Sequence, residues 1–323
     1  MPPGASLLRP AIFPLRCGGF VIIERVTIAS APTRVTAVIV NYQSYDELHR
    51  CLASLDRARD SIYVVVVDHA SDSEAAETIT RAFPAVRLLR LSDNNGFAAG
   101  INQGARETDS PFLLLLNPDC VIEPDACCRL AACIDAHDAA GVAGPRIRNA
   151  DGSVQQSARR FPDVTTAIAG RSSWLTRVAP RNPLTRHNLR VPASSSVEPM
   201  EVDWVSGACM LVRRDAFERI GGMDEGFFLY WEDADFCRRL QAAGYSTVYC
   251  PAAVATHVGG RSSRHAADAS LEAFHRSAFR LYYKHAGAGG RLFAPLVKVG
   301  LRVRLAIMKR LVRRRERASQ NAI

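Results

Sequence analysis

The sequence lacks the marks of disulfide-bonded, zinc-finger and membrane-spanning proteins. Its nine cysteines form no CxxC pair and no zinc-finger spacing, which favours buried or free thiols in a reducing compartment. No apolar stretch approaches the roughly 18 residues that a membrane-spanning helix needs. A signal peptide is disfavoured because Arg16, Glu24 and Arg25 interrupt the early apolar segment. A globular, cytoplasmic protein is the expectation.

Most of the chain has a net charge close to zero, and the positive charge is concentrated near the C-terminal end. The 323 residues carry a net charge of +9, but residues 298–317 hold nine basic residues against one acid, Glu316, and so account for +8. No base-reading motif accompanies them, so nucleic acid is not an expected partner. Apolar residues recur among these charges at near-helical spacing: Leu296, Val299, Leu305, Met308, Leu311 and Val312. The pattern favours a helix docked on a membrane surface over a solvated helix packed on the main domain.

Short β-branched runs dominate the first half of the chain. Residues 34–42 and 61–71 show no clean alternation, which is typical of strands buried on both faces of a parallel sheet. A helical pattern between them completes a βαβ unit. Further strands at 86–91 and 112–117 and helices at 98–107 and 124–137 follow. Residues 34–148 are therefore predicted to form a Rossmann-like, doubly wound, mostly parallel α/β sheet.

The remaining segments differ in character. Residues 1–33 contain no recognisable element and are predicted to be an extension. Residues 150–200 have weak periodicity and predict a long, partly mobile excursion. A strand and helix pattern returns over 200–265, and 266–323 is predicted to be a helical basic tail. With 48% hydrophobic residues, the chain can build one large α/β domain with extensions.

Polar residues follow three of the predicted strands. The carboxyl ends of parallel strands meet at one edge, where ligands bind. Each residue alone could cap a helix. The shared pattern instead favours a binding site, in which Tyr42 offers a flat face to a base, Asp68 accepts a hydrogen bond from a base or ribose, and Asp119 offers an oxygen ligand to a divalent ion. The glycines of "NNGFAAG" lack the spacing of dinucleotide or Walker loops and are expected to allow close approach to a ligand. The strand-end residues are Asn41, Tyr42, Asp68, His69, Asn117 and Asp119.

An acidic cluster follows the aromatic run "FFLYW". Glu232, Asp233 and Asp235 begin a predicted helix, and the apolar wall would desolvate a carboxylate and raise its pKa toward that of a useful general base. The alternative for all three is a first-turn charge favoured by the helix dipole. Asp235 is assigned to that role.

Six segments taken in order resemble one family: "VIVNYQS", "VVDHASDS", "NNGFAAGINQG", "LLLNPDC", "WVSGACMLVRRDAFERIGGMDEGFFLYWEDADFCRRL" and "ATHVGG". Together they resemble the inverting GT-A glycosyltransferases of family 2, in particular the rhamnosyltransferase-like branch, over about residues 35–262. The resemblance disfavours Rossmann oxidoreductases. It implies a GT-A domain at 34–265, with a nucleotide-binding half at 34–148 and an acceptor and catalytic half at 200–265.

The resemblance also implies residue roles in donor binding. Tyr42 would stack on the donor base, Asp68 would hydrogen-bond the nucleoside, and Asp119 would hold Mg or Mn together with His257. Asn117 replaces the first acid of the family's DxD motif, which predicts weaker metal affinity, and His69 stands where Asn is usual. The implied donor contacts are Val40, Tyr42, Asp68, Asn95, Gly100, Asn102, Asn117 and Asp119.

On the acceptor side, the resemblance places the general base at Asp233, with Glu232 as its neighbour. Trp204, Ser206 and Gly207 are expected to contact the acceptor or sugar, although Trp204 could equally belong to the core. Arg261 and Arg264 could close over the diphosphate.

The expected activity is metal-dependent inverting transfer of L-rhamnose from dTDP-L-rhamnose to a lipid-linked saccharide in bacterial surface polysaccharide synthesis, at the cytoplasmic face of the plasma membrane. One alternative is an inactive nucleotide-sugar-binding protein tethered at the membrane. Another is a sugar-1-phosphate nucleotidyltransferase, disfavoured because the Gly-rich, Lys-containing phosphate loop is missing. The acceptor and the linkage stay open, as does a homo-oligomer.

Overall fold

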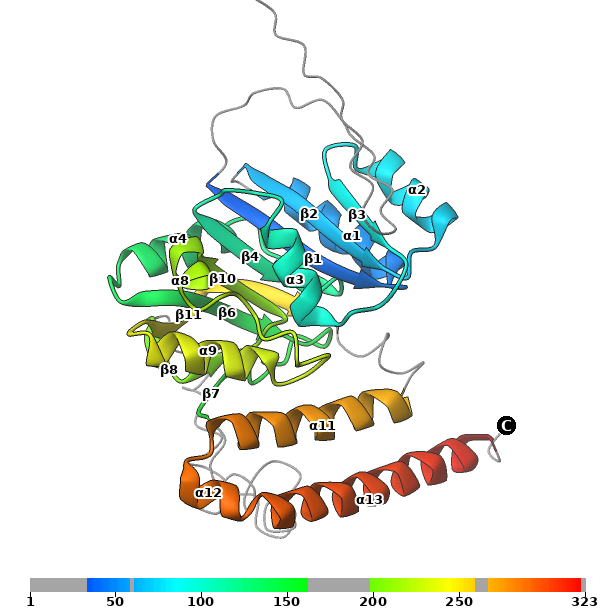
Figure 1. Ribbon diagram of the computed structural model, residues 1–323. Coiled ribbons are helices and arrows are strands. Elements are labelled where there is room, and N and C mark those ends of the chain that lie inside the picture. The colour runs from blue at the N-terminus through cyan, green and yellow to red at the C-terminus, as the bar shows by residue number, and fades with distance from the viewer. Residues whose placement is uncertain (1–33, 59–60, 162–197, 259–266, 321–323) are drawn as a thin grey trace, which may run out of the picture.

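The computed structural model describes residues 34–58, 61–161, 198–258 and 267–320. A nine-stranded sheet forms its centre, in the order β3-β2-β1-β4-β10-β6-β11-β5, with β8 also paired to β11 (Figure 1). The strands are β1 (Val35–Tyr42), β2 (Ile62–His69), β3 (Arg87–Leu91), β4 (Phe112–Leu116), β5 (Cys120–Ile122), β6 (Ala140–Arg148), β8 (Met200–Val202), β10 (Cys209–Arg213) and β11 (Ser246–His257).

Helices cover both faces of this sheet. In β1, Val35, Ala37 and Ile39 belong to one apolar core, and Val38 and Val40 belong to the other. The first core is closed by α1 (Tyr45–Asp56), α2 (Ser73–Ala82) and α4 (Ala126–Asp135). The second is closed by α3 (Phe97–Ala105), α8 (Arg214–Arg219) and α9 (Glu232–Ala242). Burial on both faces explains the continuous apolar runs and confirms the predicted α/β class.

The order of the strands creates one favourable place for a ligand. β1, β2, β3 and β4 pair in parallel, and the chain moves outward from β1 through β2 to β3 before β4 returns to the other side of β1. The strand order therefore reverses between β1 and β4. Ligands of open α/β sheets bind at such a point, beyond the carboxyl ends of the strands.

The second half of the sequence contributes to the same sheet. β10 runs antiparallel to both β4 and β6 and lies between them. Its Met210, Leu211 and Val212 are fully buried. Strands from beyond the predicted 34–148 sheet therefore complete it.

A small two-stranded sheet lies beside the main one. It pairs β7 (Ala158–Arg159) with β9 (Trp204–Val205) and so joins the two sides of the long excursion. Most of that excursion, the extension at 1–33, and Arg261 and Arg264 fall outside the described residues.

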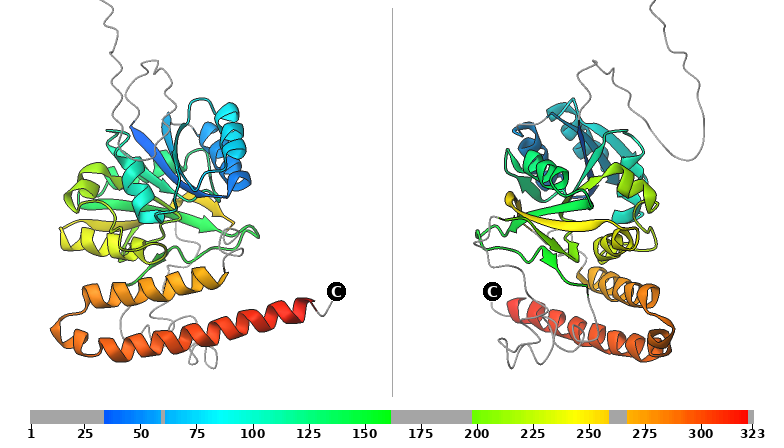
Figure 2. Two further views of the ribbon diagram at one scale, coloured as in Figure 1. Left: turned by 45° about the vertical axis from the view of Figure 1, so that its right-hand side comes forward. Right: turned by 90° about the vertical axis from the view of Figure 1, so that its left-hand side faces the viewer.

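The C-terminal helices form a layer beneath the domain. α11 (Ala267–His285) lies next to the domain, α12 (Ala288–Leu292) turns the chain, and α13 (Ala294–Gln320) runs along the outer side of α11 (Figure 2). Arg280 and Lys284 of α11 form ion pairs with Asp224 at 2.8 and 2.6 Å. Within the described ranges, no helix is both long and apolar enough to cross a membrane.

Candidate active site

The ends of β1 and β2 form one edge of the site. In the strand register Asn41 pairs with Asp68 and Tyr42 pairs with His69, so the predicted residues lie together. Tyr42 is 39% exposed and presents its ring at the surface. This placement suits stacking on a flat ligand.

Asp68 is fully buried, and its carboxylate accepts hydrogen bonds from neighbouring side chains. Its Oδ1 accepts a hydrogen bond from Asn41 Nδ2 at 2.7 Å, and its Oδ2 accepts from the hydroxyls of Tyr45 and Ser71 at 2.9 and 2.5 Å. Burial and the charge of Asp68 raise the pKa of Tyr45, so its phenol stays a donor. Asp68 therefore organises this edge of the sheet, and its contact with a nucleoside stays a prediction.

The glycine-rich turn has a packing role that the sequence did not predict. Gly96 has φ +88°, and a Cβ there would lie 2.3 Å from the carbonyl oxygen of Phe228. A Cβ on Gly100 would come within 2.8 Å of the buried Val40. These glycines let α3 approach β1 and residue 228, and the expected approach to a ligand stays a prediction. Asn95 is exposed on the same turn.

Asn102 also proves to be a structural link. Its amide nitrogen donates to the Met223 carbonyl and to Glu225 Oε1, both at 2.9 Å, and its oxygen accepts from the Met223 N–H at 2.8 Å. The side chain is 7% exposed and ties α3 to the 223–225 loop. We therefore leave Asn102 and Gly100 out of the proposed donor contacts.

His69 lies between β2 and this turn. Its Nδ1 is 3.0 Å from Asn94 Oδ1, which also accepts from the Gly96 N–H at 2.9 Å. Burial lowers the pKa of His69, which favours the neutral ring. Among the described residues its buried Nε2 has no hydrogen-bond partner. Asn94, which the sequence analysis did not single out, thus orders both the histidine and the turn.

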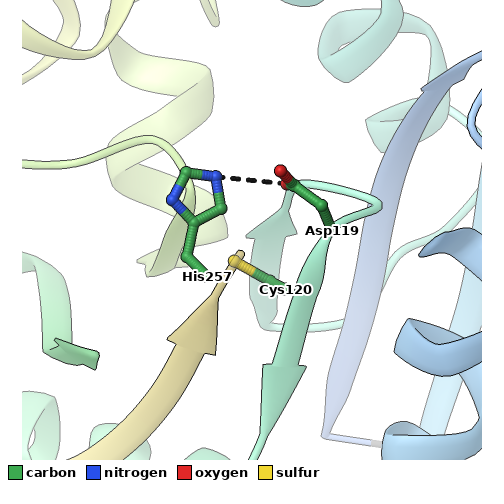
Figure 3. A group of neighbouring side chains, drawn as sticks. All are labelled: Asp119, Cys120 and His257. Atoms are coloured by element: carbon green, nitrogen blue, oxygen red, sulfur yellow. Dashed lines mark ion pairs between the residues drawn. The ribbon is translucent and has the colours of Figure 1, made fainter. Parts of the chain in front are cut away.

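The predicted metal ligands meet although they are distant in sequence. Asp119 follows β4 and His257 ends β11, whose pairing with β5 sets His257 opposite Cys120. Nε2 of His257 lies 3.1 Å from Oδ1 of Asp119 (Figure 3). The two side chains are 19% and 17% exposed, so a solute can reach them.

Gln155 fixes the tautomer of the His257 ring and so determines that the nitrogen nearest Asp119 carries a lone pair. Its amide nitrogen donates to the His257 carbonyl at 2.8 Å, which turns its oxygen toward Nδ1 at 3.2 Å. Nδ1 then carries the proton, and Nε2 faces the carboxylate as a second acceptor. Two acceptors at this distance need a proton or a cation between them. A carboxylate oxygen and an imidazole nitrogen suit a divalent ion such as Mn.

Cys120 adjoins this pair, and its chemistry makes it a poor ligand. The thiol is fully buried and donates to the Ala208 carbonyl at 3.1 Å. Burial raises its pKa well above the ordinary value, so it stays protonated. The half-buried Asn117 lies on the same turn and adds no charge. Asp119 and His257 are therefore the residues of this cluster that fit a hard cation.

Asp233 lies in the first turn of α9, which begins directly after two residues with a strained backbone conformation. Tyr230 and Trp231 both have φ +68°, a conformation that costs about 1–3 kcal/mol for such residues and is found mainly at functional sites. Asp233 is half-buried and accepts hydrogen bonds from the N–H groups of Gly207 at 3.0 Å and Ala234 at 2.8 Å. Burial raises the pKa of Asp233, while these bonds and the charge of Arg159 oppose the rise.

The two neighbouring acids differ from Asp233. Glu232 is 7% exposed, and burial together with the charge of Asp233 raises its pKa well above the ordinary value, which favours the neutral form. Among the described residues its buried Oε2 has no partner. Asp235 does lie in the first turn, as predicted, but it is fully buried and held by Arg239, Lys284 and His285 at 2.7–2.9 Å. Asp235 therefore anchors α9 to α11.

Of the predicted acceptor residues, Gly207 contacts Asp233 directly. A Cβ on Gly207 would lie 3.3 Å from that of Asp233, so glycine permits the close approach. The Ser206 hydroxyl accepts from the Ala208 N–H at 3.3 Å. Trp204 is only 5% exposed, and the guanidinium of Arg159 lies 5.0 Å from its ring centroid. The exposed Arg159 was missed because its segment shows no periodicity.

Comparison with known proteins accounts for this arrangement. The model of a family described as glycosyltransferase like family 2 matches residues 32–284. The chain belongs to this family. It is 34% identical over 254 residues to the N-acetylglucosaminyl-diphospho-decaprenol L-rhamnosyltransferase of Mycobacterium tuberculosis, covering 75% of this chain and 81% of that protein. It is 27% identical over 257 residues to the rhamnosyltransferase WbbL of Escherichia coli K12, covering 77% and 90%.

Solved structures confirm the GT-A fold of this glycosyltransferase. The mannosyltransferase PcManGT from Pyrobaculum calidifontis, in complex with GDP-Man and Mn²⁺, is similar with a TM-score of 0.54 and 16% identity, over 86% of this chain and 75% of that one. GalNAc-T7 with UDP, GalNAc and Mn²⁺ has the same TM-score and identity, over 70% of this chain and 43% of that longer one.

A short path of contacts joins the two halves of this glycosyltransferase. Asp233 accepts from the N–H of Gly207, and the carbonyl of the next residue, Ala208, accepts from the Asn117 N–H at 2.9 Å. The candidate base and the turn that carries Asp119 are thus attached to the same loop. The site is one unit built from β4, the loop before β10, and α9.

Proposed function

We propose that this glycosyltransferase moves L-rhamnose from dTDP-L-rhamnose to a lipid-linked saccharide with inversion, in bacterial surface polysaccharide synthesis. The observation that carries the proposal is the attachment of Asp233 and the Asp119 turn to one loop. The names of two relatives, both rhamnosyltransferases and one acting on a diphospho-decaprenol-linked sugar, support the choice of donor and acceptor. A lipid-linked acceptor implies work at the cytoplasmic face of the plasma membrane.

The donor would bind beyond β1 and β4. The exposed ring of Tyr42 would stack on the base above the buried Val40. Asn95, which is exposed, and the half-buried Asn117 can hydrogen-bond the nucleoside and ribose. A divalent cation held by Asp119 and His257 would offset the charge of the diphosphate.

Asp233 would act on the acceptor. Its carboxylate takes the proton of the acceptor hydroxyl while the oxygen forms a bond to the anomeric carbon, and the bond from that carbon to the nucleoside diphosphate breaks on the opposite face. Inversion follows from this single displacement. A pKa raised by burial makes Asp233 a stronger base than an exposed aspartate.

A donor panel tests the proposal. Purified protein is given dTDP-L-rhamnose, UDP-sugars or GDP-mannose with a lipid-linked N-acetylglucosaminyl diphosphate and Mn²⁺, and the anomeric configuration of the product is determined by NMR. We expect rhamnose transfer with inversion. Donor binding without turnover on any acceptor would favour the alternative of an inactive binding protein. That alternative is considered because Asn117 replaces the first acid of the DxD motif.

A further inference from the structure

The outermost helical layer carries a row of exposed apolar side chains. We define the α13 stripe as seven exposed side chains that recur every three or four residues, apart from the adjacent first pair. At 3.6 residues per turn the five members that belong to α13 fall within an arc of about 120°, and Leu292 and Phe293 come just before that helix, at the end of α12. Their exposed fractions run from 38% to 81%. The members are Leu292, Phe293, Leu296, Val299, Val303, Ile307 and Leu311.

The opposite side of α13 packs on α11. Arg304 lies over the ring of Phe274 at 5.6 Å, and Lys309 and Arg313 pair with Glu272 and Asp268. Leu305, Met308 and Val312, which the sequence assigned to one apolar face with Leu296, are half-buried on this inner side. The helix therefore has two apolar faces, and only the α13 stripe is left toward solvent in the described part of the chain.

The charges around the α13 stripe are all of one sign. Residues 294–314 contain seven basic residues and no acid. Lys298, Arg302, Arg310 and Arg314 are among the exposed ones. The members within α13 extend over residues 296–311, which corresponds to about 23 Å of helix. Soluble monomers rarely leave an apolar surface of this extent uncovered.

We propose that the α13 stripe lies on an anionic lipid membrane surface, with its apolar side chains at the acyl boundary and its arginines and lysines at the headgroups. A second copy is a poor occupant, because pairing two such helices would bring the exposed Lys298, Arg302, Arg310 and Arg314 of each copy together, with no acid in residues 294–314 to offset them. Nucleic acid is a poor occupant too, because its phosphates leave an apolar stripe uncovered. A helix with one apolar and one cationic region matches an interfacial helix.

This docking would also orient the active site. α11 lies between α13 and the domain, and its Phe274 packs against Trp231, with ring centroids 5.4 Å apart. Ser277 Oγ donates to the Leu229 carbonyl at 2.9 Å. The segment that precedes Glu232 is therefore held at a fixed place relative to α13. A docked α13 would set the height of the site above the membrane.

Vesicle sedimentation of the full chain tests the proposal without donor or acceptor. The vesicles are phosphatidylcholine alone or mixed with phosphatidylglycerol. The first variant combines Leu296→Gln, Val303→Gln and Ile307→Gln, and its matched control combines Leu296→Met, Val303→Ile and Ile307→Leu. We expect the glutamine variant to lose at least about tenfold in partitioning and the control to bind as the wild type does.

A charge variant separates the two contributions. Arg302→Gln with Arg310→Gln and Arg314→Gln should weaken binding to the phosphatidylglycerol vesicles and reduce its salt dependence. Circular dichroism should be unchanged in every variant, and because the test uses neither donor nor acceptor it is independent of the proposed function. The proposal would be overturned if the glutamine variant sediments with vesicles as the wild type does. It would also be overturned if the wild type is a dimer in solution and the glutamine variant is a monomer.

Discussion

The side-chain oxygen of Gln155 lies 3.2 Å from Nδ1 of His257, while its amide nitrogen donates to the main-chain carbonyl of the same histidine. Both contacts come from one residue, so the imidazole is fixed in orientation and in tautomer. Nε2 is left as an acceptor toward Asp119. A protein group that orients a metal-binding histidine in this way contributes to affinity without touching the ion.

Replacing Gln155 tests that role. Gln155→Leu removes both contacts and should weaken Mn²⁺ binding about 10- to 100-fold. Gln155→Glu keeps an acceptor for Nδ1–H and should bind Mn²⁺ far better than the leucine variant. Calorimetric titration without donor sugar gives the affinities. Equal binding by the leucine variant and the wild type would remove Gln155 from the site.

Asp119→Ala and His257→Ala should each abolish the dependence of donor binding on metal. Each change removes one of the two groups that face each other at 3.1 Å. Donor binding is measured by calorimetry with Mn²⁺ and with a chelator, and Cys120→Ser is the control that should keep the dependence. A His257→Ala protein whose donor affinity still responds to Mn²⁺ would exclude that residue as a ligand.

Sequence reasoning was most successful where burial leaves a local signature. The apolar runs of β1 and β4 exist because both faces are covered, and polar strand ends stand out against them. Long-range pairing leaves no such mark, so the position of β10 between β4 and β6 could not be predicted. Gln155 was missed because one contact with a distant histidine creates no periodicity. Gly100 and Asn102 were assigned to the donor by resemblance and both also have packing or linking roles, because packing and binding select the same residue types.

The general base is tested by a pair of isosteric changes. Asp233→Asn should cost about 10²–10⁴ in turnover while donor binding stays nearly intact, because the base acts on the acceptor. Glu232→Gln should stay within a few-fold of wild type, because burial already favours the neutral acid. Steady-state rates and donor affinity are measured for both. An inactive Glu232→Gln beside an active Asp233→Asn would move the base one residue back.

The pH profile should report the environment of Asp233. The base works only when deprotonated, and burial raises its pKa above the ordinary 3.8, so turnover should fall with decreasing pH through that raised value. The charge of Arg159 opposes the rise. Arg159→Gln should therefore move the acid limb to higher pH, whereas Arg81→Gln, a change at an exposed arginine on α2, should leave it in place. A shift to lower pH would contradict this electrostatic coupling.

Asp235 is predicted to be the main anchor between α9 and the C-terminal helices. It is fully buried with Arg239, Lys284 and His285 as partners, so Asp235→Ala leaves cationic groups uncompensated and should destabilise the fold by about 3–5 kcal/mol. Arg313→Gln breaks the exposed pair with Asp268 and should cost no more than about 1 kcal/mol. Urea unfolding measures both. Because α9 begins at Glu232, a folded Asp235→Asn protein should also lose turnover with little change in donor affinity, and unchanged turnover would mean that α11 does not position the base.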